Sequence, residues 1–182
     1  MSYYFYHPLG DNYNKWEAWS YNNHGIGKVD FLTGKEVPFY AMVTGKIVFC
    51  GTYSDGNVAI VQECTDSNLG ETFYIRYLHG KNIEELNGKI VEKGTKLGMV
   101  SNNNGRYSTH LHVDFSYVQN DFSPIKGELN EQKRTWTCKG IKFNLQPDCD
   151  LQKVKNLANA NGYGYNTPGY CWLVFASPCL LY

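Results

Sequence analysis

The stretch from residue 109 to residue 117 reads Thr109-His110-Leu111-His112-Val113-Asp114-Phe115-Ser116-Tyr117. Polar and apolar side chains alternate along it, and a period of two is typical of a β-strand with one wet face and one face on a core. Because alternate residues of a strand point to the same side, His110 and His112 are expected on one face, one strand step apart. The stretch therefore predicts a strand that presents two imidazoles together.

Further strand candidates precede this stretch. They are residues 39–43, 46–51, 58–63, 72–79 and, punctuated by glycines, 88–100. Thr44-Gly45 predicts a tight turn between the first two, and the polar segment 64–71 predicts a hairpin loop between the next two. Residues 1 to about 36 are rich in polar, aromatic and turn residues, with little periodicity. The chain is therefore expected to be mainly β, with antiparallel sheets and one short helix over 150–159 in a mixed C-terminal tail.

Composition excludes some classes of function. The 182 residues carry 17 basic and 17 acidic side chains, and no basic stripe stands out, so nothing favours nucleic-acid binding. The first twenty residues lack the basic and apolar regions of a signal peptide. The apolar run at 170–182 is short and is broken by Pro178, so no membrane span is expected.

The six cysteines form no C-x-x-C pair, which disfavours a zinc knuckle or ribbon. Cys50 and Cys64 lie in strand-like runs, where buried small hydrophobes are at least as good an interpretation as disulfides. Four cysteines follow residue 137, and disulfides among them are possible.

The histidines suggest a metal centre. There are five, and an isolated H-x-H pair is more often an ordinary hydrogen-bonded pair than a metal site. A catalytic zinc site needs three ligands from His, Asp or Glu and an open position for water. His24 and Asp30, in an early glycine-bearing loop, together with one histidine of the H-x-H pair would supply that set. Each also has a simpler interpretation: a solvated loop histidine for His24 and a turn or capping residue for Asp30.

Several motifs in a fixed order resemble the lysostaphin-like M23 zinc metallopeptidases over roughly residues 24–117. These motifs are Asp30-Phe31, Pro38-Phe39-Tyr40-Ala41, Thr44-Gly45-Lys46-Ile47-Val48, Tyr77-Leu78-His79, Val91-Glu92-Lys93-Gly94-Thr95-Lys96-Leu97-Gly98 and Ser108-Thr109-His110-Leu111-His112. The resemblance implies antiparallel sheets that form a groove around a zinc centre.

Carried over position by position, the resemblance implies Zn²⁺ held by His24, Asp30 and His112. His79 and His110 would face the substrate, as general base for water or as stabilisers of the oxyanion. The loop between His24 and Asp30 is longer than is usual in the family. His7 has no counterpart and is expected to be an ordinary surface residue.

The lengthened loop resembles that of the peptidase domain of tail-knob proteins from short-tailed phages, as does the tail around Val154-Lys155-Asn156 and Asn161-Gly162-Tyr163. The implied function is hydrolysis of peptide bonds in peptidoglycan cross-links or stem peptides, at a phage tail tip in the virion, acting on the bacterial cell wall. A catalytically inactive structural or wall-binding M23-like module is the alternative. A secreted bacteriocin would share the chemistry, but it would need an export signal.

Three segments are expected: an N-terminal segment 1–24, a peptidase core 25–118 and a C-terminal extension 119–182. The apolar end of the extension is expected to pack on the core, or to dock to another phage tail protein or to a second copy; a membrane-active role is the least favoured. Arg106 and Tyr107, just before the H-x-H pair, would border the cleft. A solvated loop is the favoured interpretation for both.

Overall fold

The structure is a computed structural model, and it describes residues 6–10, 21–22, 28–66, 71–116, 118–122, 127–138, 141–144 and 150–152. Regular structure in these ranges is almost entirely strand, which confirms the mainly β fold. Of the helix predicted over 150–159 the structure describes residues 150–152, in which Leu151 and Gln152 are helical, and the rest of that prediction lies outside the described residues. Within the described ranges, no helix is long and apolar enough to cross a bilayer.

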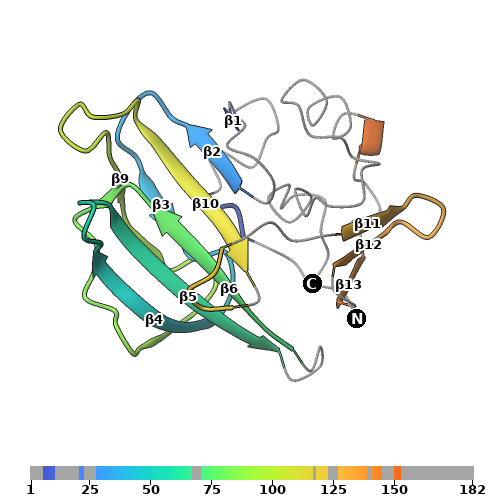
Figure 1. Cartoon of the computed structure of the whole chain (residues 1–182). Coiled ribbons are helices and arrows are strands. Elements are labelled where there is room, and N and C mark those ends of the chain that lie inside the picture. The colour runs from blue at the N-terminus through green and yellow to red at the C-terminus, as the bar shows by residue number, and fades with distance from the viewer. Residues whose placement is uncertain are drawn as a thin grey trace.

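A seven-stranded antiparallel sheet forms the main body. Its strands in spatial order are β1 (Tyr21–Asn22), β2 (Lys28–Leu32), β10 (His110–Ser116), β6 (Glu71–Leu78), β5 (Val58–Asp66), β4 (Gly45–Thr52) and β8 (Ile90–Val91). Figure 1 shows β10 running between β2 and β6, so the strand with the H-x-H pair has a partner on each side.

Two smaller antiparallel sheets complete the described structure. One contains β3 (Pro38–Tyr40), β9 (Lys96–Val100) and β7 (Gly80–Lys81), with β9 in the middle. The other is a meander of β11 (Gly127–Asn130), β12 (Thr135–Cys138) and β13 (Ile141–Asn144), drawn apart from the large sheet in Figure 1. The sequence did not predict these last three strands, which lie in the expected C-terminal extension.

Most strand predictions in the core are confirmed, but one connection is wrong. The hairpin expected between 39–43 and 46–51 does not form, because β3 pairs with β9 and β4 pairs with β5. Gly45 lies so close to β5 that an added Cβ would sit 2.0 Å from the carbonyl oxygen of Glu63. The Thr44-Gly45 signal therefore reflects a close approach between β4 and β5. The hairpin of β5 and β6 is confirmed.

The core lies on the apolar side of β10, where Leu111, Val113 and Phe115 are fully buried. Phe115 packs on Phe73 with ring centroids 4.9 Å apart. The polar side of the strand is buried too, so the wet face predicted for it is wrong. Its polar side chains contact one another and the neighbouring strands, which removes the need for water as their partner.

A buried hydrogen-bond network joins the bend after β3 to the large sheet. The Tyr77 hydroxyl accepts from the Met42 backbone N–H and donates to Gln62 Oε1, both at 2.9 Å. Gln62 Nε2 donates to the Val43 carbonyl at 2.6 Å. Because each of these polar groups has a hydrogen-bond partner, the bonds offset the cost of removing them from water.

His7 is buried, which corrects the expectation of a surface residue. The His7 imidazole packs against the Phe31 ring of β2, with the two ring centroids 5.6 Å apart. Its Nδ1 accepts a hydrogen bond of 3.0 Å from the Leu9 backbone N–H. Burial lowers the pKa of His7 to about 3, so the residue is neutral in the folded protein.

Cys64 is buried and Cys50 half-buried, and neither forms a disulfide. The interpretation of Cys64 as a buried small residue is confirmed.

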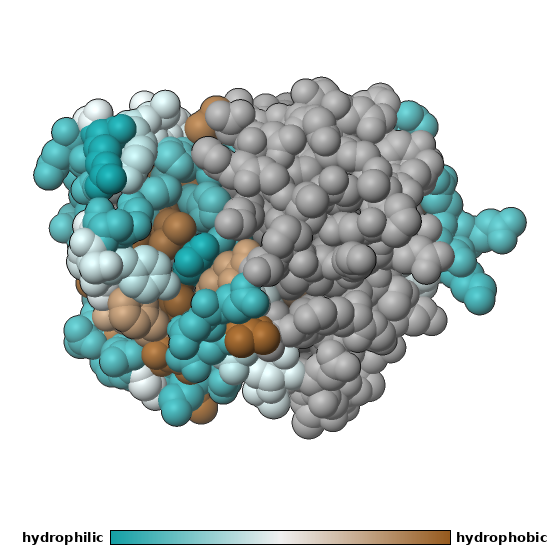
Figure 2. Space-filling view, viewed as in Figure 1, coloured by the Kyte–Doolittle hydropathy of each residue, from teal (hydrophilic) through white to brown (hydrophobic). Residues whose placement is uncertain are grey.

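The surface in Figure 2 is mainly hydrophilic where residues are described, with small and separated hydrophobic areas.

Candidate active site

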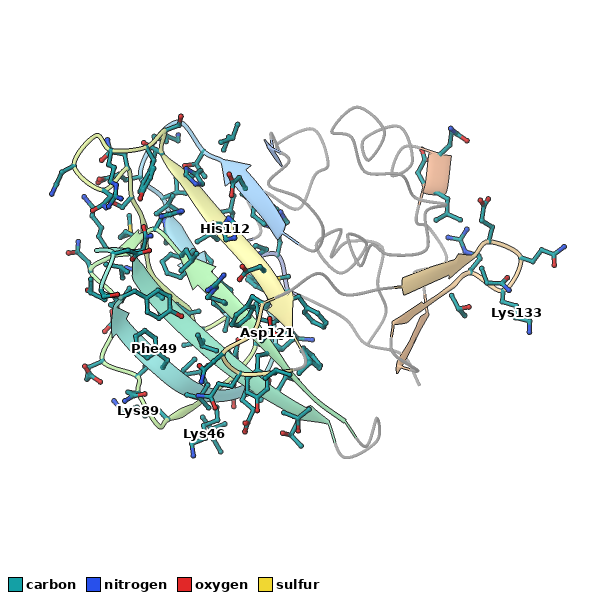
Figure 3. All side chains as sticks on the ribbon, viewed as in Figure 1. Lys46, Phe49, Lys89, His112, Asp121 and Lys133 are labelled. Atoms are coloured by element: carbon teal, nitrogen blue, oxygen red, sulfur yellow. The ribbon has the colours of Figure 1, made fainter. Side chains whose placement is uncertain are left out.

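The pairing of β2 with β10 brings Asp30 opposite His112 in register, although the two are far apart in the sequence. His112 Nδ1 lies 2.7 Å from Asp30 Oδ1. Asp30 is 2% exposed and His112 8%, so the contact is shielded from water. Figure 3 shows His112 on β10 beside β2. The structure therefore brings together two of the three expected metal ligands.

The second nitrogen of His112 meets another carboxylate. Its Nε2 lies 3.2 Å from Asp114 Oδ2, on the next same-face position of the strand. Each ring nitrogen of His112 therefore faces a carboxylate oxygen, a group that accepts hydrogen bonds and can share in binding a cation. Burial lowers the pKa of His112, but the hydrogen bonds and charges of Asp114 and Asp30 outweigh burial, and the net pKa is raised.

Asp114 is completely buried, and Arg76 from β6 neutralises it. The guanidinium binds both carboxylate oxygens, with distances of 2.8 Å from Nε to Oδ1 and 2.5 Å from Nη2 to Oδ2. Burial raises the pKa of Asp114, but the hydrogen bonds and charges of His112 and Arg76 outweigh it and lower the pKa. Asp114 is therefore an anion held between the Arg76 guanidinium and the His112 imidazole.

His110 lies on the same face of β10, as the alternation predicted. Its Nδ1 is 2.6 Å from the Ser108 carbonyl oxygen, which only accepts, so Nδ1 carries the hydrogen. The other nitrogen, Nε2, points toward the site and lies 3.7 Å from Asp30 Oδ2. In the neutral ring, Nε2 is then the nitrogen that accepts a proton on the site side.

His79 follows β6 and adopts a left-handed backbone conformation with φ of 67°. This conformation is uncommon for a residue other than glycine, and it persists where the surroundings hold it. Here the His79 N–H donates to the Val58 carbonyl and its carbonyl accepts from the Ser101 N–H. The turn brings its ring centroid within 4.6 Å of His110 and 6.0 Å of His112.

Tyr107 packs beside the rings of His79 and His110. Its ring centroid lies 4.7 Å from that of His79 and 6.1 Å from that of His110. Its hydroxyl donates to Asn57 Oδ1 at 3.2 Å, which ties the loop before β10 to the turn between β4 and β5. Tyr107 is thus half-buried against a candidate catalytic residue, and the solvated-loop interpretation is wrong for it. Arg106 is exposed, as expected, and its Nη1 donates to the Asp55 carbonyl at 3.0 Å.

The fit to a metal ion depends on which donors converge. Among the residues that the structure describes, no three His, Cys, Asp or Glu side chains form a group that could hold a metal. Asp30 and His112 do converge, through a carboxylate oxygen and an imidazole nitrogen, which are donors that zinc accepts. His24 lies outside the described residues, so its role as the third ligand stays a prediction. The donors present suit a divalent cation that receives one further ligand.

Sequence reasoning missed Asp114 and Arg76. Asp114 had a signal, because it continues the same-face alternation of His110 and His112 along β10. Arg76 had none, since its contact with Asp114 depends on which strand β10 pairs with.

The chain resembles known proteins in family and in fold. The model of the family described as Peptidase family M23 matches residues 24–124. No curated protein sequence matches the chain.

Three solved structures are similar in fold. A zinc-containing peptidase from Vibrio cholerae shares 19% identity, covering 63% of this chain and 37% of that one, with a TM-score of 0.46. An M23 peptidase from Pseudomonas aeruginosa shares 21% identity, covering 54% and 41%, with a TM-score of 0.45. Lysostaphin from Staphylococcus simulans shares 24% identity, covering 58% and 42%, with a TM-score of 0.44.

The chain thus spans less than half the length of each of these three proteins. The family match covers more than half of this chain, and it includes Asp30, His79, His110 and His112. The chain therefore belongs to peptidase family M23, a family of metallopeptidases.

Proposed function

We propose that this protein is a zinc-dependent endopeptidase that hydrolyses peptide bonds in the cross-links or stem peptides of bacterial peptidoglycan. The observation that carries the proposal is the 2.7 Å approach of His112 Nδ1 to Asp30 Oδ1, with His110 and His79 beside it. A buried carboxylate and imidazole that can both bind a metal, next to two further imidazoles, are the groups that metal-assisted hydrolysis needs.

Zinc would be held by Asp30, His112 and His24. The chemistry that such an ion supplies is Lewis acidity toward a carbonyl group and toward water. Asp30 contributes negative charge that favours the cation, and His112 contributes Nδ1. Both are buried, so the charge interaction is weakly screened by solvent.

The proton transfer is assigned to His110, which lies beside His79 and Tyr107. His110 holds its own Nδ1 hydrogen on the Ser108 carbonyl, which leaves Nε2 to accept a proton from the attacking water. His79, close to both other rings, is assigned to the developing oxyanion, and the proton that His110 takes from water is passed on to the leaving amine. The Tyr107 ring limits the freedom of both imidazoles. The groove expected for the substrate stays part of the proposal.

The closing experiment is metal analysis of the purified chain, followed by a turbidity assay on Gram-positive cell walls. We expect about one zinc per chain, loss of turbidity that a chelator abolishes and zinc restores, and mass spectra of released muropeptides that identify the bond cut. A zinc-free protein without lytic activity, after incubation with excess zinc, would contradict the proposal.

The alternative function is that of an inactive wall-binding module. It has no support from the ligand residues that the structure describes, because Asp30 and His112 are both in place. It predicts co-sedimentation with cell walls in the absence of zinc and no released muropeptides, which the same assays measure.

The site of action is proposed from the resemblance to phage tail-knob peptidase domains. The lengthened loop between His24 and Asp30 and the motifs at 154–156 and 161–163 support a place in the virion tail. Docking of the apolar end, residues 170–182, to a neighbouring tail protein or to a second copy belongs to the same proposal. Mass spectrometry of purified virions that encode the chain would detect it among the tail proteins, and its absence there would contradict this assignment.

A further inference from the structure

Asp114 and Arg76 form a buried pair that the proposed hydrolysis does not use directly. Asp114 has no exposed surface, whereas the Arg76 side chain is 20% exposed. A buried carboxylate is costly unless it is paired and hydrogen-bonded, and here both oxygens have partners. Asp114 Oδ2 also faces His112 Nε2, so the carboxylate contacts the candidate metal ligand on the ring nitrogen that does not face Asp30.

The geometry constrains which nitrogen of His112 is available for a metal. Asp114 accepts from Nε2–H at 3.2 Å, and an acceptor at that position stabilises the tautomer with hydrogen on Nε2. Nδ1 faces Asp30, the other proposed ligand, so with an ion bound by Asp30 the Nδ1 lone pair would be directed to that ion while Asp114 accepts from Nε2–H. A carboxylate behind a metal-binding histidine fixes the orientation of the ring and makes it a better ligand.

Arg76 fixes Asp114 in turn. Its two parallel hydrogen bonds hold the carboxylate in one orientation, which a single contact would not do. The guanidinium carbon lies 4.3 Å from the centroid of the Phe122 ring, which covers it as a cation–π partner. Phe122 is 9% exposed and follows β10 after a turn in which the Ser116 hydroxyl contacts the Val118 and Asp121 carbonyls.

We infer that Asp114 is a positioning residue for the metal centre. Arg76 orients the Asp114 carboxylate, and that carboxylate holds the His112 ring so that Nδ1 can bind the ion. This inference rests on the proposed zinc site. It adds that the ligand strength of His112 depends on a residue that touches neither the substrate nor the ion.

The test compares zinc affinity, by competition with a chromophoric chelator, in the wild-type chain, Asp114→Asn and Glu63→Gln. Glu63 is a matched control, because it is also a hydrogen-bonded carboxylate of the large sheet, accepting from the Tyr74 hydroxyl at 3.0 Å away from the histidines. We expect the zinc dissociation constant of Asp114→Asn to rise by about 10- to 100-fold. We expect that of Glu63→Gln to stay at the wild-type value.

A spectroscopic readout separates positioning from folding. In the zinc-loaded wild-type protein, long-range ¹⁵N–¹H spectra of the histidine side chains should show His112 with hydrogen on Nε2 and the metal on Nδ1. The opposite tautomer, or an Asp114→Asn variant with unchanged zinc affinity, would overturn the inference while leaving the proposed function intact. Failure of the wild-type chain to bind zinc would instead refute the proposed function.

If Asp114→Asn does not fold, as judged by circular dichroism, Arg76→Gln replaces it. Arg76 is partly exposed, so glutamine is tolerated there more easily, and Asp114 keeps its contact with His112. We expect a smaller rise in the zinc dissociation constant than for loss of the carboxylate. An unchanged dissociation constant in this variant would also overturn the inference.

Discussion

The two faces of β2 carry two buried histidine environments with opposite properties. On one face Phe31 packs against His7, which is 5% exposed, and burial lowers the pKa of His7 to about 3. On the other face Asp30 contacts His112, which is 8% exposed, and the net pKa of His112 is raised. Adjacent residues of one strand therefore separate a neutral histidine in the core from a histidine held between carboxylates.

This difference shows that burial alone does not decide what a histidine does. Removal from water disfavours the charged ring at both positions. His112 has carboxylates at hydrogen-bond distance on both of its nitrogens, whereas the pKa of His7 is set by burial. Substitutions on the Asp30 face should therefore change metal binding and catalysis, and substitutions on the Phe31 face should change stability alone.

The largest effect is expected for Asp30→Ala, which removes the carboxylate from the site face. Peptide hydrolysis should fall to background and zinc binding should be lost, because one of three ligands is gone and His112 loses its partner. Activity on cell walls and zinc content per chain are the measurements. Glu92→Ala, which removes an exposed carboxylate elsewhere, is the control, and a zinc content equal to wild type in Asp30→Ala would contradict the assignment.

His110→Ala should separate catalysis from metal binding within the same face. A positioned general base contributes about 10²- to 10⁴-fold to rate, so the turnover number should fall by that factor. The zinc content should stay near that of the wild-type protein, because His110 is not an expected ligand. Equal loss of zinc and activity would show instead that His110 binds the metal.

On the core face, His7→Asn should alter the pH dependence of stability. The folded pKa of about 3 lies below the ordinary value of 6.5, so between these values the unfolded chain binds a proton that the folded chain does not. Stability is therefore lost as pH falls from 6.5 toward 3, by about 1.4 kcal/mol per pH unit. Asparagine keeps an acceptor for the Leu9 N–H but does not titrate.

Urea unfolding of the metal-free protein at pH 7 and pH 4.5 measures this effect. The wild-type chain should lose about 2 to 3 kcal/mol more than His7→Asn between the two pH values. Activity at pH 7 should be equal in the two proteins. An identical pH dependence of stability would show that His7 is not buried in its neutral form.

The smallest effect is expected for Tyr107→Leu, at the edge of the site face. An aromatic contact of this kind is worth about 0.5 to 1.5 kcal/mol, so the turnover number should fall by roughly 2- to 10-fold. Tyr107→Phe keeps the ring and removes only the hydrogen bond to Asn57, and it should remain closer to wild type. The reverse order of the two variants would show that the hydroxyl, and not the ring, matters.

Much of the fold could be predicted because its signals are local. The alternation in β10, the polar loop between β5 and β6 and the glycines around β9 each reflect a period or a turn within a few residues. The five-residue strand β2 was missed because it is short and its place depends on pairing with β10. The burial of His7 was missed because nothing local indicates that its segment pairs with Tyr40 and Met42 and places its ring against Phe31.

The sequence by itself determined that His110, His112 and Asp114 share one face, since a strand places alternate side chains on the same side. It also supplied the order of motifs that resembles family M23, whose model matches residues 24–124. Only the tertiary structure decided that Asp30 meets Nδ1 of His112, that Asp114 meets Nε2, and that Arg76 neutralises Asp114. These contacts join β2, β10 and β6, and the register between strands is set by packing of the whole sheet rather than by any one segment.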